Sequence, residues 1–538
     1  MTWNYADIYE AVADVLPDDA PALIHKDTVT TWKELEYRAN NLARSLLDAG
    51  LGYGDKVGFY LRNHSAYMEM LFATFKARLS HVNVNYRYIE DELWYILDNS
   101  DSRAVLFDAE FREQARALMP RLPEVKLWIQ LEDEDDLLPG AVSYTQLAAE
   151  GDGARLGIEH SGADLLLLYT GGTTGMPKGV MWEQQSHWEA GARGATPATN
   201  MIPPATIAEH AENVRKAGPG RKSFPVCPQM HGTGLFTSIG ALAQGGCIVT
   251  TNSVRFDPEE TWQLVDTHKV NAMAIVGDAF AKPLLAVLDQ DPGKYDISSL
   301  LMMISSGVMW SPEVKQGLLR HNQQLTLIDS FGASEAVGFG TSTTTAAGGQ
   351  GIAKFVLNER TKVFTEDFKE VLPGSDTPGF VAKTGGIPSG YYKDPEKSAK
   401  TFPVIDGVRY SIPGDWCRVE ADGTLTLLGR GSVCINTAGE KVYPEEVEEI
   451  LKTHADVYDA LVVGVPDEKW GQSVTGVVQL HEGREMDEAA LRAHVHKSLA
   501  GYKCPKRVIA IDDIGRAQNG KADYKRITEY AKTSLGIV

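Results

Sequence analysis

The residues Leu165-Leu-Leu-Leu-Tyr-Thr-Gly-Gly-Thr-Thr-Gly-Met-Pro-Lys-Gly179 form the most informative stretch of this sequence. The apolar run predicts a buried strand, and a loop of glycines and hydroxyls follows it. Glycines tolerate positive φ and let successive backbone N–H groups face an anion. The hydroxyls of Thr170, Thr173 and Thr174 and the ammonium of Lys178 suit a polyphosphate. The stretch therefore predicts a phosphate-binding loop that follows a strand.

This loop differs from the Walker phosphate loop, in which Gly-Lys-Ser/Thr runs directly into a helix. Here Met176-Pro177 separates Gly175 from Lys178, and Gly-Val follows the lysine. For an arbitrary glycine-rich loop, a flexible turn between strands is the better interpretation. The order Thr-Thr-Gly-x-Pro-Lys-Gly argues against that interpretation here.

That order resembles the signature loop of the adenylate-forming superfamily, which includes acyl-CoA synthetases, peptide-synthetase adenylation domains and luciferases. The resemblance extends from about Thr31 to Lys521. Within the superfamily, the sequence is most similar to bacterial fatty-acyl and steroid side-chain CoA ligases, and the motif Asn83-Val-Asn-Tyr-Arg-Tyr88 shows the same similarity. A single short match is weak, whereas an ordered set is specific. The further motifs are, in order, Phe331-Gly-Ala-Ser-Glu335, Tyr410-Ser-Ile-Pro-Gly-Asp415, Gly429-Arg430, Gly439-Glu-Lys-Val-Tyr-Pro-Glu-Glu446 and Asn519-Gly-Lys521.

The bulk composition excludes several classes of protein. A chain of 538 residues is longer than a single hydrophobic core usually supports, so at least two domains are expected. A net charge of −20 argues against nucleic-acid binding, which needs a basic surface. No segment is apolar enough to span a bilayer, and the first residues lack a secretory signal. The five cysteines show no Cys-x-x-Cys pairing, which suits a reducing cytoplasm and argues against a zinc site.

Alternating helix and strand patterns predict an α/β fold with layered, largely parallel sheets. Thr31-Trp-Lys-Glu34 has the form of a capping box, and Gly50 stands where that helix should end. Beyond Arg430 a helix with proline in its first turn, short strands and a second helix predict a small mobile α+β domain. We therefore expect an adenylation domain over 1–429 and a C-terminal domain over 430–538. Strands are expected at 56–61, 271–276, 326–329, 460–464 and 474–479, and helices after Thr31, Asp257 and Ser311 and at 207–217, 443–451 and 487–499.

The resemblance implies a reaction in two halves. A carboxylate attacks the α-phosphorus of ATP to give acyl-AMP and pyrophosphate, and the thiol of CoA then displaces AMP. Bringing two anions together requires cations and Mg²⁺. The resemblance implies that Glu335, with Thr174, holds Mg²⁺, that Lys521 bridges the carboxylate and the α-phosphate, and that His231 borders the acyl carboxylate. Without the resemblance, Glu335 and Lys521 would be ordinary surface charges and His231 a structural histidine.

The same resemblance implies a set of nucleotide contacts. Asp415 would bind both ribose hydroxyls, since two carboxylate oxygens match a vicinal diol, with Arg430 beside it. Phe331 would stack on adenine, although a core position is the alternative, and Asp329 would accept from the adenine amino group. Gly439 would leave room for the pantetheine of CoA, and Lys441 would meet CoA or pyrophosphate. The remaining predicted contacts are Thr170, Gly171, Gly172, Thr173, Thr174, Gly175, Lys178, Ser330, Gly332, Ala333 and Ser334.

Two regions depart from the family pattern or leave alternatives open. At the hinge, where many relatives carry a Lys-Asp pair, this chain has Ser432 and Val433, while Gly431 supplies backbone freedom. The segment from about 183 to 222 is either a surface excursion or a wall of the acyl pocket. Asp278 in the expected pocket indicates a polar group on the substrate or a buried hydrogen bond. The candidate pocket residues are Trp188, His231, Phe236, Asp278, Phe280, Ser306 and Met309.

The sequence therefore predicts an acyl-CoA ligase that uses ATP, Mg²⁺, CoA and a hydrophobic carboxylic acid. A stand-alone adenylation enzyme that loads a carrier-protein thiol is the nearest alternative. A luciferase-like oxygenase would catalyse the same adenylation half-reaction. A nucleotide-binding regulator that lacks catalysis would account less well for the full set of motifs. The sequence leaves open which acid is used and the oligomeric state, for which a homodimer is one possibility.

Overall fold

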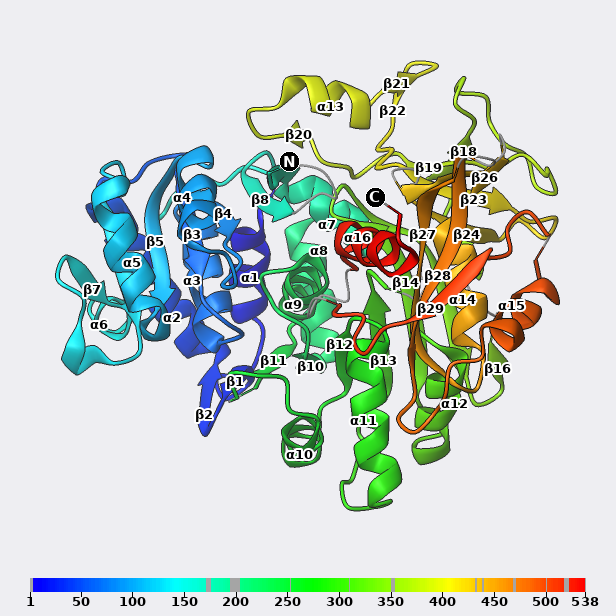
Figure 1. Cartoon of the computed structure of the whole chain (residues 1–538). Helices are drawn as coiled ribbons and strands as arrows, with labels where there is room; N and C mark the ends of the chain where they lie inside the picture. Colours follow the sequence, from blue (N-terminus) through cyan, green and yellow to red (C-terminus); the bar gives the residue numbers. More distant parts are fainter. Residues whose placement is uncertain are drawn as a thin grey trace. The chain divides into compact units, whose positions relative to one another are not determined.

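The structure is a computed structural model that describes residues 3–170, 176–193, 204–251, 253–308, 310–349, 354–430, 433–437, 440–467, 471–499, 501–516 and 522–537. It divides into two compact units, one of residues 1–350 and 383–411 and one of residues 351–382 and 412–538. The predicted class is confirmed, because a large α/β N-terminal part is followed by a separate small α+β C-terminal domain (Figure 1). The predicted boundary at residue 430 stays a prediction. No helix among the described residues has the length and apolar character needed to cross a bilayer.

The first sheet of the large unit has the strand order β20-β9-β8-β4-β3-β5-β6-β7. The pairs from β8 to β7 are parallel, whereas β9 pairs antiparallel with both β8 and β20. Successive residues point to opposite faces, so Phe59 and Tyr60 are buried in two different cores. The strands are β3 (Lys56–Tyr60), β4 (Ser80–Asn83), β5 (Ser102–Asp108), β6 (Leu127–Leu131), β7 (Ala141–Ser143), β8 (Leu165–Thr170), β9 (Lys178–Glu183) and β20 (Gly390–Tyr391).

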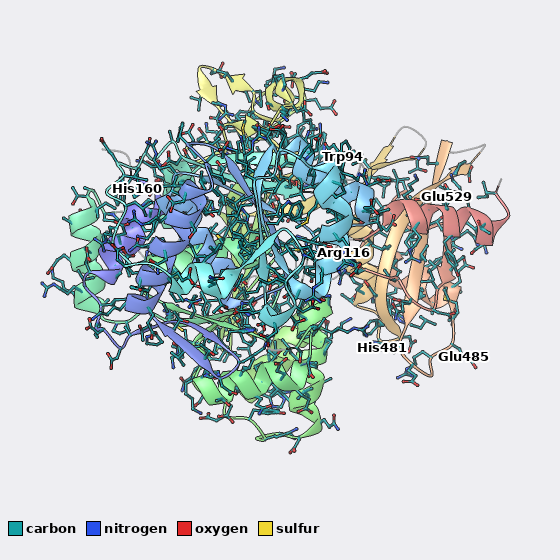
Figure 2. The ribbon with its side chains drawn as sticks, turned by 90° about the vertical axis from the view of Figure 1, so that its left-hand side faces the viewer. Trp94, Arg116, His160, His481, Glu485 and Glu529 are labelled. Atoms are coloured by element: carbon teal, nitrogen blue, oxygen red, sulfur yellow. The ribbon has the colours of Figure 1, made fainter. Side chains whose placement is uncertain are left out.

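Helices cover both faces of this sheet, as a mostly parallel sheet requires. Residues of α1, α2, α3 and α6 share a core with Phe59, and residues of α4 and α5 share the other core with Tyr60. Figure 2 labels Trp94 on α4 and Arg116 on α5. The helices are α1 (Tyr5–Ala13), α2 (Trp32–Asp48), α3 (Ser65–Lys76), α4 (Glu90–Asn99), α5 (Arg112–Leu118) and α6 (Tyr144–Ala149), with short 3₁₀ turns at η1 (Ala109–Phe111), η2 (Met119–Arg121) and η3 (Glu134–Asp136).

The N-terminal helix α1 is fastened to distant parts of the chain. The side chain of Asn4 caps the helix and donates to Asp164 Oδ2 at 3.1 Å. The backbone N–H of Tyr5 donates to Gln184 Oε1 at 2.9 Å, and its hydroxyl lies 2.6 Å from His187 Nδ1. These contacts tie the start of the chain to the residues just before β8 and to helix α7 (Gln184–Arg193).

The second sheet of the large unit has the order β2-β1-β11-β10-β12-β13-β14-β15. Its pairs are parallel from β1 to β14 and antiparallel at both ends. Strand β14 extends to Ala333, beyond the expected 326–329, so Phe331 lies within the strand and not after it. The strands are β1 (Pro21–His25), β2 (Thr28–Thr31), β10 (Lys222–Pro225), β11 (Cys247–Thr250), β12 (Ala272–Ile275), β13 (Met302–Ser306), β14 (Thr326–Ala333), β15 (Ala336–Thr345) and β16 (Gly348–Gly349).

Capping signals in the sequence correctly located several helices. Thr31 accepts from the N–H of Glu34, whose carboxylate accepts from the N–H of Thr31, so the predicted capping box is confirmed. Asp257 caps its helix in the same way through the N–H groups of residues 259 and 260. The remaining elements of this unit are α8 (Ile207–Ala217), α9 (Gly232–Ala243), α10 (Pro258–His268), α11 (Asp278–Gln290), α12 (Pro312–His321), α13 (Pro395–Thr401), β21 (Val404–Ile405) and β22 (Val408–Arg409).

The second unit contains two sheets. One has the order β18-β19-β23-β24-β17, and the other, in the C-terminal domain, has the order β26-β25-β28-β27 with β29 beside β28. Along β27, Val462 packs in the core that contains residues of α14 and α15, and Val463 packs in the core that contains residues of α16. The elements are β17 (Lys354–Leu357), β18 (Thr361–Phe364), β19 (Gly379–Lys383), β23 (Asp415–Val419), β24 (Leu425–Arg430), β25 (Ile435–Thr437), β26 (Glu440–Val442), α14 (Pro444–Lys452), β27 (Val457–Asp467), β28 (Gly471–Leu480), α15 (Glu488–His496), β29 (Arg507–Ala510) and α16 (Tyr524–Leu535).

Buried neutral histidines make the stability of the large unit depend on pH. Burial lowers the pKa of His25, His81 and His187 from 6.5 to about 3 in each case. Below pH 6.5 the unfolded chain therefore binds protons that the folded chain does not, and stability falls as the pH falls toward 3. Each histidine contributes about 1.4 kcal/mol per pH unit in that window. Urea midpoints measured between pH 7 and pH 4.5 should fall accordingly.

The substitution His81→Gln should reduce this slope by about 1.4 kcal/mol per pH unit, since glutamine takes up no proton. The matched control is His496→Gln in α15, because His496 is exposed on the small domain. Equal slopes for the wild-type protein and His81→Gln would contradict the assignment of His81 as a neutral buried group.

Candidate active site

The described flanks of the predicted phosphate loop form an antiparallel pair. Thr170 at the end of β8 pairs with Lys178 at the start of β9. The hydroxyl of Tyr95 in α4 donates to the carbonyl of Pro177 at 3.2 Å and holds the returning strand. The buried strand before the loop is therefore confirmed. Five predicted phosphate contacts lie outside the described residues, namely Gly171, Gly172, Thr173, Thr174 and Gly175.

The ammonium of Lys178 forms an ion pair with Asp394 Oδ2. Sequence reasoning missed Asp394, although an Asp-Pro pair that begins a helix is a usable signal. Because the carboxylate of Asp394 accepts from the Lys178 ammonium and from the N–H of Lys397, the pKa of Asp394 is lowered. The pair borders a cavity of about 310 Å³. The cavity is lined by Tyr95, Asn99, Met176, Pro177, Lys178, Tyr392, Lys393 and Asp394.

Glu335 lies in the turn of the β14–β15 hairpin, where Ala333 pairs with Ala336. The indole N–H of Trp182 in β9 donates to the carbonyl of Ser334 at 2.9 Å and joins this turn to the other sheet. The hydroxyl of Ser411 donates to the carbonyl of Glu335 at 2.7 Å. The hydroxyl of Tyr391 donates to Glu335 Oε1 at 2.7 Å. A ligating carboxylate is usually oriented by such hydrogen bonds, so this geometry fits a Mg²⁺ ligand.

The strand residues before Glu335 differ in their surroundings. Asp329 is buried and forms an ion pair with Lys315 of α12, a partner that the sequence did not indicate. The ring of Phe331 is buried and lies 5.1 Å from that of Phe339. The strand pairing shifts register between Phe331 and Ala333, and a Cβ at Gly332 would come within 3.2 Å of two backbone atoms. Ser330 pairs with residues of both neighbouring strands. The contacts of Asp329, Ser330, Phe331 and Gly332 with the nucleotide stay predictions.

Two asparagines position the loop that leads to His231, the residue before α9. The buried amide of Asn83 donates to the carbonyls of Tyr169 at 2.9 Å and Met230 at 2.8 Å. Its carbonyl accepts from the Tyr169 N–H at 2.6 Å. Asn63 binds the segment 225–229 in the same way. Asn83 therefore joins β8, which leads into the predicted phosphate loop, to Met230, the residue before the half-buried His231.

Asn83→Ala should lower the stability of the large unit by about 2–4 kcal/mol, because three buried backbone groups lose their partners. It should also lower kcat/KM by about tenfold, because the Thr170 end of β8 and His231 lose their common support. Urea unfolding and steady-state AMP formation measure the two effects. The matched control is Asn85→Ala, since the Asn85 side chain accepts from the N–H of Arg87 two residues away and contacts neighbours in its own loop. Wild-type values for Asn83→Ala would refute this role.

In the second unit, the two predicted ribose-binding residues lie opposite each other. Asp415 begins β23 and pairs with Arg430 at the end of β24. Asp415 is 8% exposed. This pairing brings together two residues that are fifteen positions apart in the sequence. Their binding of the ribose stays a prediction. Gly439 and Lys521 lie outside the described residues, as do the side chains of Arg430 and Lys441.

The candidate acyl-pocket residues fall into two groups. Trp188 in α7 and Phe236 in α9 lie in the aromatic region around His187, whose ring is 4.2 Å from that of Phe236. Asp278, by contrast, accepts from the N–H of Ser311 at 2.9 Å in a partly buried hydrogen bond, and its contact with the substrate stays a prediction. Phe280 packs in a core against Phe256, Ser306 ends β13, and Met309 lies outside the described residues.

One group of three potential metal ligands stands among the described residues, and it is separate from the predicted Mg²⁺ site. It consists of His25, His64 and Glu132. The N–H of Ala66 donates to His64 Nδ1 at 2.9 Å, so His64 Nε2 carries the proton and donates to Glu132 Oε1 at 3.2 Å. Since His64 caps α3 in this tautomer, its Nε2 has no lone pair for a metal. We assign the group a structural role.

Comparison with family models places these elements in a known group. The model described as "AMP-binding enzyme" matches residues 9–392, and "AMP-binding enzyme C-terminal domain" matches residues 446–521. The chain belongs to the AMP-binding enzyme family. The family recognised in the sequence is therefore confirmed, and Lys178, Asp329, Glu335 and Asp394 are residues of an AMP-binding enzyme.

The relatives of this AMP-binding enzyme include several CoA ligases. A 3-oxocholest-4-en-26-oate–CoA ligase of Rhodococcus rhodochrous is 40% identical, covering 100% of this chain and 97% of the relative. A medium/long-chain-fatty-acid–CoA/3-oxocholest-4-en-26-oate–CoA ligase of Mycolicibacterium smegmatis is 41% identical, covering 98% and 96%. The solved structure of the anthranilate CoA ligase AuaEII with anthranoyl-AMP matches the fold with a TM-score of 0.85 at 20% identity, covering 99% and 98%.

Proposed function

We propose that this protein is an ATP-dependent acyl-CoA ligase that activates a hydrophobic carboxylic acid as acyl-AMP and transfers the acyl group to CoA. The observation that carries the proposal is the segment Tyr391–Asp394, which contacts both Lys178 and Glu335. A cation for phosphate and a carboxylate for Mg²⁺ therefore share one support in the large unit. The full-length similarity to CoA ligases supports the same activity.

Each proposed role follows from the charge and shape of the side chain. Lys178 would bind the polyphosphate, and Glu335 would hold Mg²⁺, which neutralises phosphate charge when bound. Asp415 and Arg430 would bind the ribose, and Phe331 the adenine. Lys521 would stabilise the charge that develops between the carboxylate and the α-phosphate. Gly439 would leave a passage for CoA. The residues of the predicted phosphate loop and the strand residues before Glu335 would make the remaining contacts with the nucleotide.

We propose a hydrophobic acid because the relatives are named for steroid side-chain and medium- or long-chain fatty acids. Trp188, Phe236 and His187 would form part of the apolar wall, which makes α7 a pocket element and not a surface excursion. Burial of Cys227 and Cys247 raises the pKa of each thiol to about 12, and no disulfide joins the five cysteines. Unpaired thiols suit the proposed cytoplasmic location.

The test is AMP release with ATP and Mg²⁺ across straight-chain, aryl and steroid side-chain acids, with and without CoA. Turnover that depends on CoA for one class of acid would support the ligase and identify its substrate class. AMP or pyrophosphate formation that is indifferent to CoA would instead favour a carrier-protein thiol as acceptor. Absence of pyrophosphate release with every acid would refute the proposal and favour a regulator.

A further inference from the structure

The turn after β20 presents Asp394 to Lys178 in a defined geometry. Tyr391 pairs with Val180 of β9, so the turn begins beside the strand that carries Lys178. Lys393 has a φ of 56°, in the left-handed region that a lysine seldom adopts. Such a conformation persists where surrounding contacts enforce it.

Asp101 supplies the contacts that enforce this turn. Its Oδ1 accepts from the Lys393 ammonium at 2.8 Å, and its Oδ2 accepts from the Tyr392 hydroxyl at 2.6 Å. The ammonium of Lys56 donates to the same hydroxyl at 3.1 Å. The side chains of Asp101 and Lys56 therefore hold the two residues that precede Asp394. The position of Asp394 is fixed by the large unit itself.

The two oxygens of Asp394 have separate partners. Oδ1 accepts from the N–H of Lys397 at 2.9 Å and caps α13, whereas Oδ2 pairs with Lys178. The Lys178 and Asp394 side chains are 38% and 28% exposed, so an anion in the adjoining cavity can reach the ammonium. Without nucleotide, the carboxylate of Asp394 supplies the negative charge that a phosphate would bring.

We propose that Asp394 competes with polyphosphate for Lys178 and thereby speeds the release of pyrophosphate. The inference rests on the proposed function, which makes Lys178 a phosphate ligand. A phosphate must displace the carboxylate in order to bind, so part of its interaction with Lys178 replaces an existing ion pair. When pyrophosphate leaves, Asp394 recovers the lysine, and the ammonium is never left without an anion. Asp394 is thus a positioning residue that tunes affinity through Lys178.

The experiment is Asp394→Asn, because asparagine keeps the cap of α13 but removes the charge. Calorimetric titration of the whole protein with inorganic pyrophosphate and Mg²⁺ should give a Kd about three- to fivefold lower than the wild-type value, the size expected for a partly exposed ion pair. Pyrophosphate release, followed by stopped flow, should slow by a similar factor. Adenosine, which has no phosphate, should bind as in the wild-type protein.

The matched control is Glu396→Gln, which removes a charge from the same helix at a carboxylate that forms its ion pair with Lys400 and acts on Lys178 without a direct contact. It should change the pyrophosphate Kd much less than Asp394→Asn. In a Lys178→Met background, Asp394→Asn should have no effect on that Kd. If Asp394→Asn folds poorly, Asp394→Ser keeps a capping oxygen and serves as the second variant.

An unchanged or higher pyrophosphate Kd in Asp394→Asn, with wild-type adenosine binding, would overturn the competition and leave the ligase proposal standing. A wild-type protein that binds neither ATP nor pyrophosphate would refute both this inference and the proposed function. A lower Kd that persists in the Lys178→Met background would show that Asp394 acts by general charge and would also overturn the inference.

Discussion

Lys521→Ala is expected to slow acyl-adenylate formation by a factor of about 100 to 1,000 while thioester formation from supplied acyl-AMP continues at the wild-type rate. Removal of a single charge that stabilises a transition state has effects of this size. The second half-reaction has AMP as its leaving group and does not need the bridge between carboxylate and α-phosphate. The two halves are measured separately, by pyrophosphate release without CoA and by acyl-CoA formation from synthetic acyl-AMP.

The described residues on either side of position 521 are anchored by partly buried side-chain contacts. The guanidinium of Arg516 donates to both carboxylate oxygens of Asp459 at 2.6 and 2.9 Å. The hydroxyl of Tyr524 donates to the buried carboxylate of Glu448 at 3.0 Å, and burial raises the pKa of Glu448. The chain is thus fastened to the small domain shortly before and after Lys521.

The matched control for this test is Lys525→Ala, which removes an exposed lysine from α16. It should leave both half-reactions at wild-type rates. If Lys521→Ala lowered both half-reactions equally without loss of folding, the proposed division of labour would be wrong.

Gly439→Leu is expected to have the opposite signature, with CoA-dependent turnover lowered by about 100-fold and acyl-AMP formation retained. A leucine side chain would obstruct a passage that only a glycine leaves open for pantetheine. The readouts are acyl-CoA formation at saturating CoA and pyrophosphate release in its absence. Gly501→Leu is the control within the same domain, since a Cβ there meets no atom closer than 3.6 Å. Normal CoA turnover in Gly439→Leu would remove the argument for a passage.

Most of the fold could be predicted because its signals are local. The capping box of Thr31 and Glu34 and the Asp-Pro start at Asp257 each lie within four residues and fixed their helices correctly. The extension of β14 through Phe331 to Ala333 could not be predicted in this way. It depends on antiparallel pairing with β15, and such pairing depends on partners that the local sequence does not identify.

The candidate site was predicted less completely because its supporting contacts are distant in sequence. Lys178 and Asp394 are 216 residues apart, and Asn83 and Met230 are 147 apart. The resemblance supplied the residues expected to touch the nucleotide and the substrate, but it did not supply their partners. Asn83 stood within a quoted motif, yet nothing in its neighbours indicated that it would bind two distant backbone segments.

The contacts of helix α1 have a consequence for the order of folding. Its hydrogen bonds to Asp164, Gln184 and His187 span 160, 179 and 182 residues. At a synthesis rate of about 5–20 residues per second, about 10–35 s pass between the synthesis of Tyr5 and that of His187. During that time helix α1 can pack against α2 and α3 but lacks its hydrogen bonds to Asp164, Gln184 and His187. Helix α1 can therefore complete its hydrogen bonds only after α7 has been synthesised.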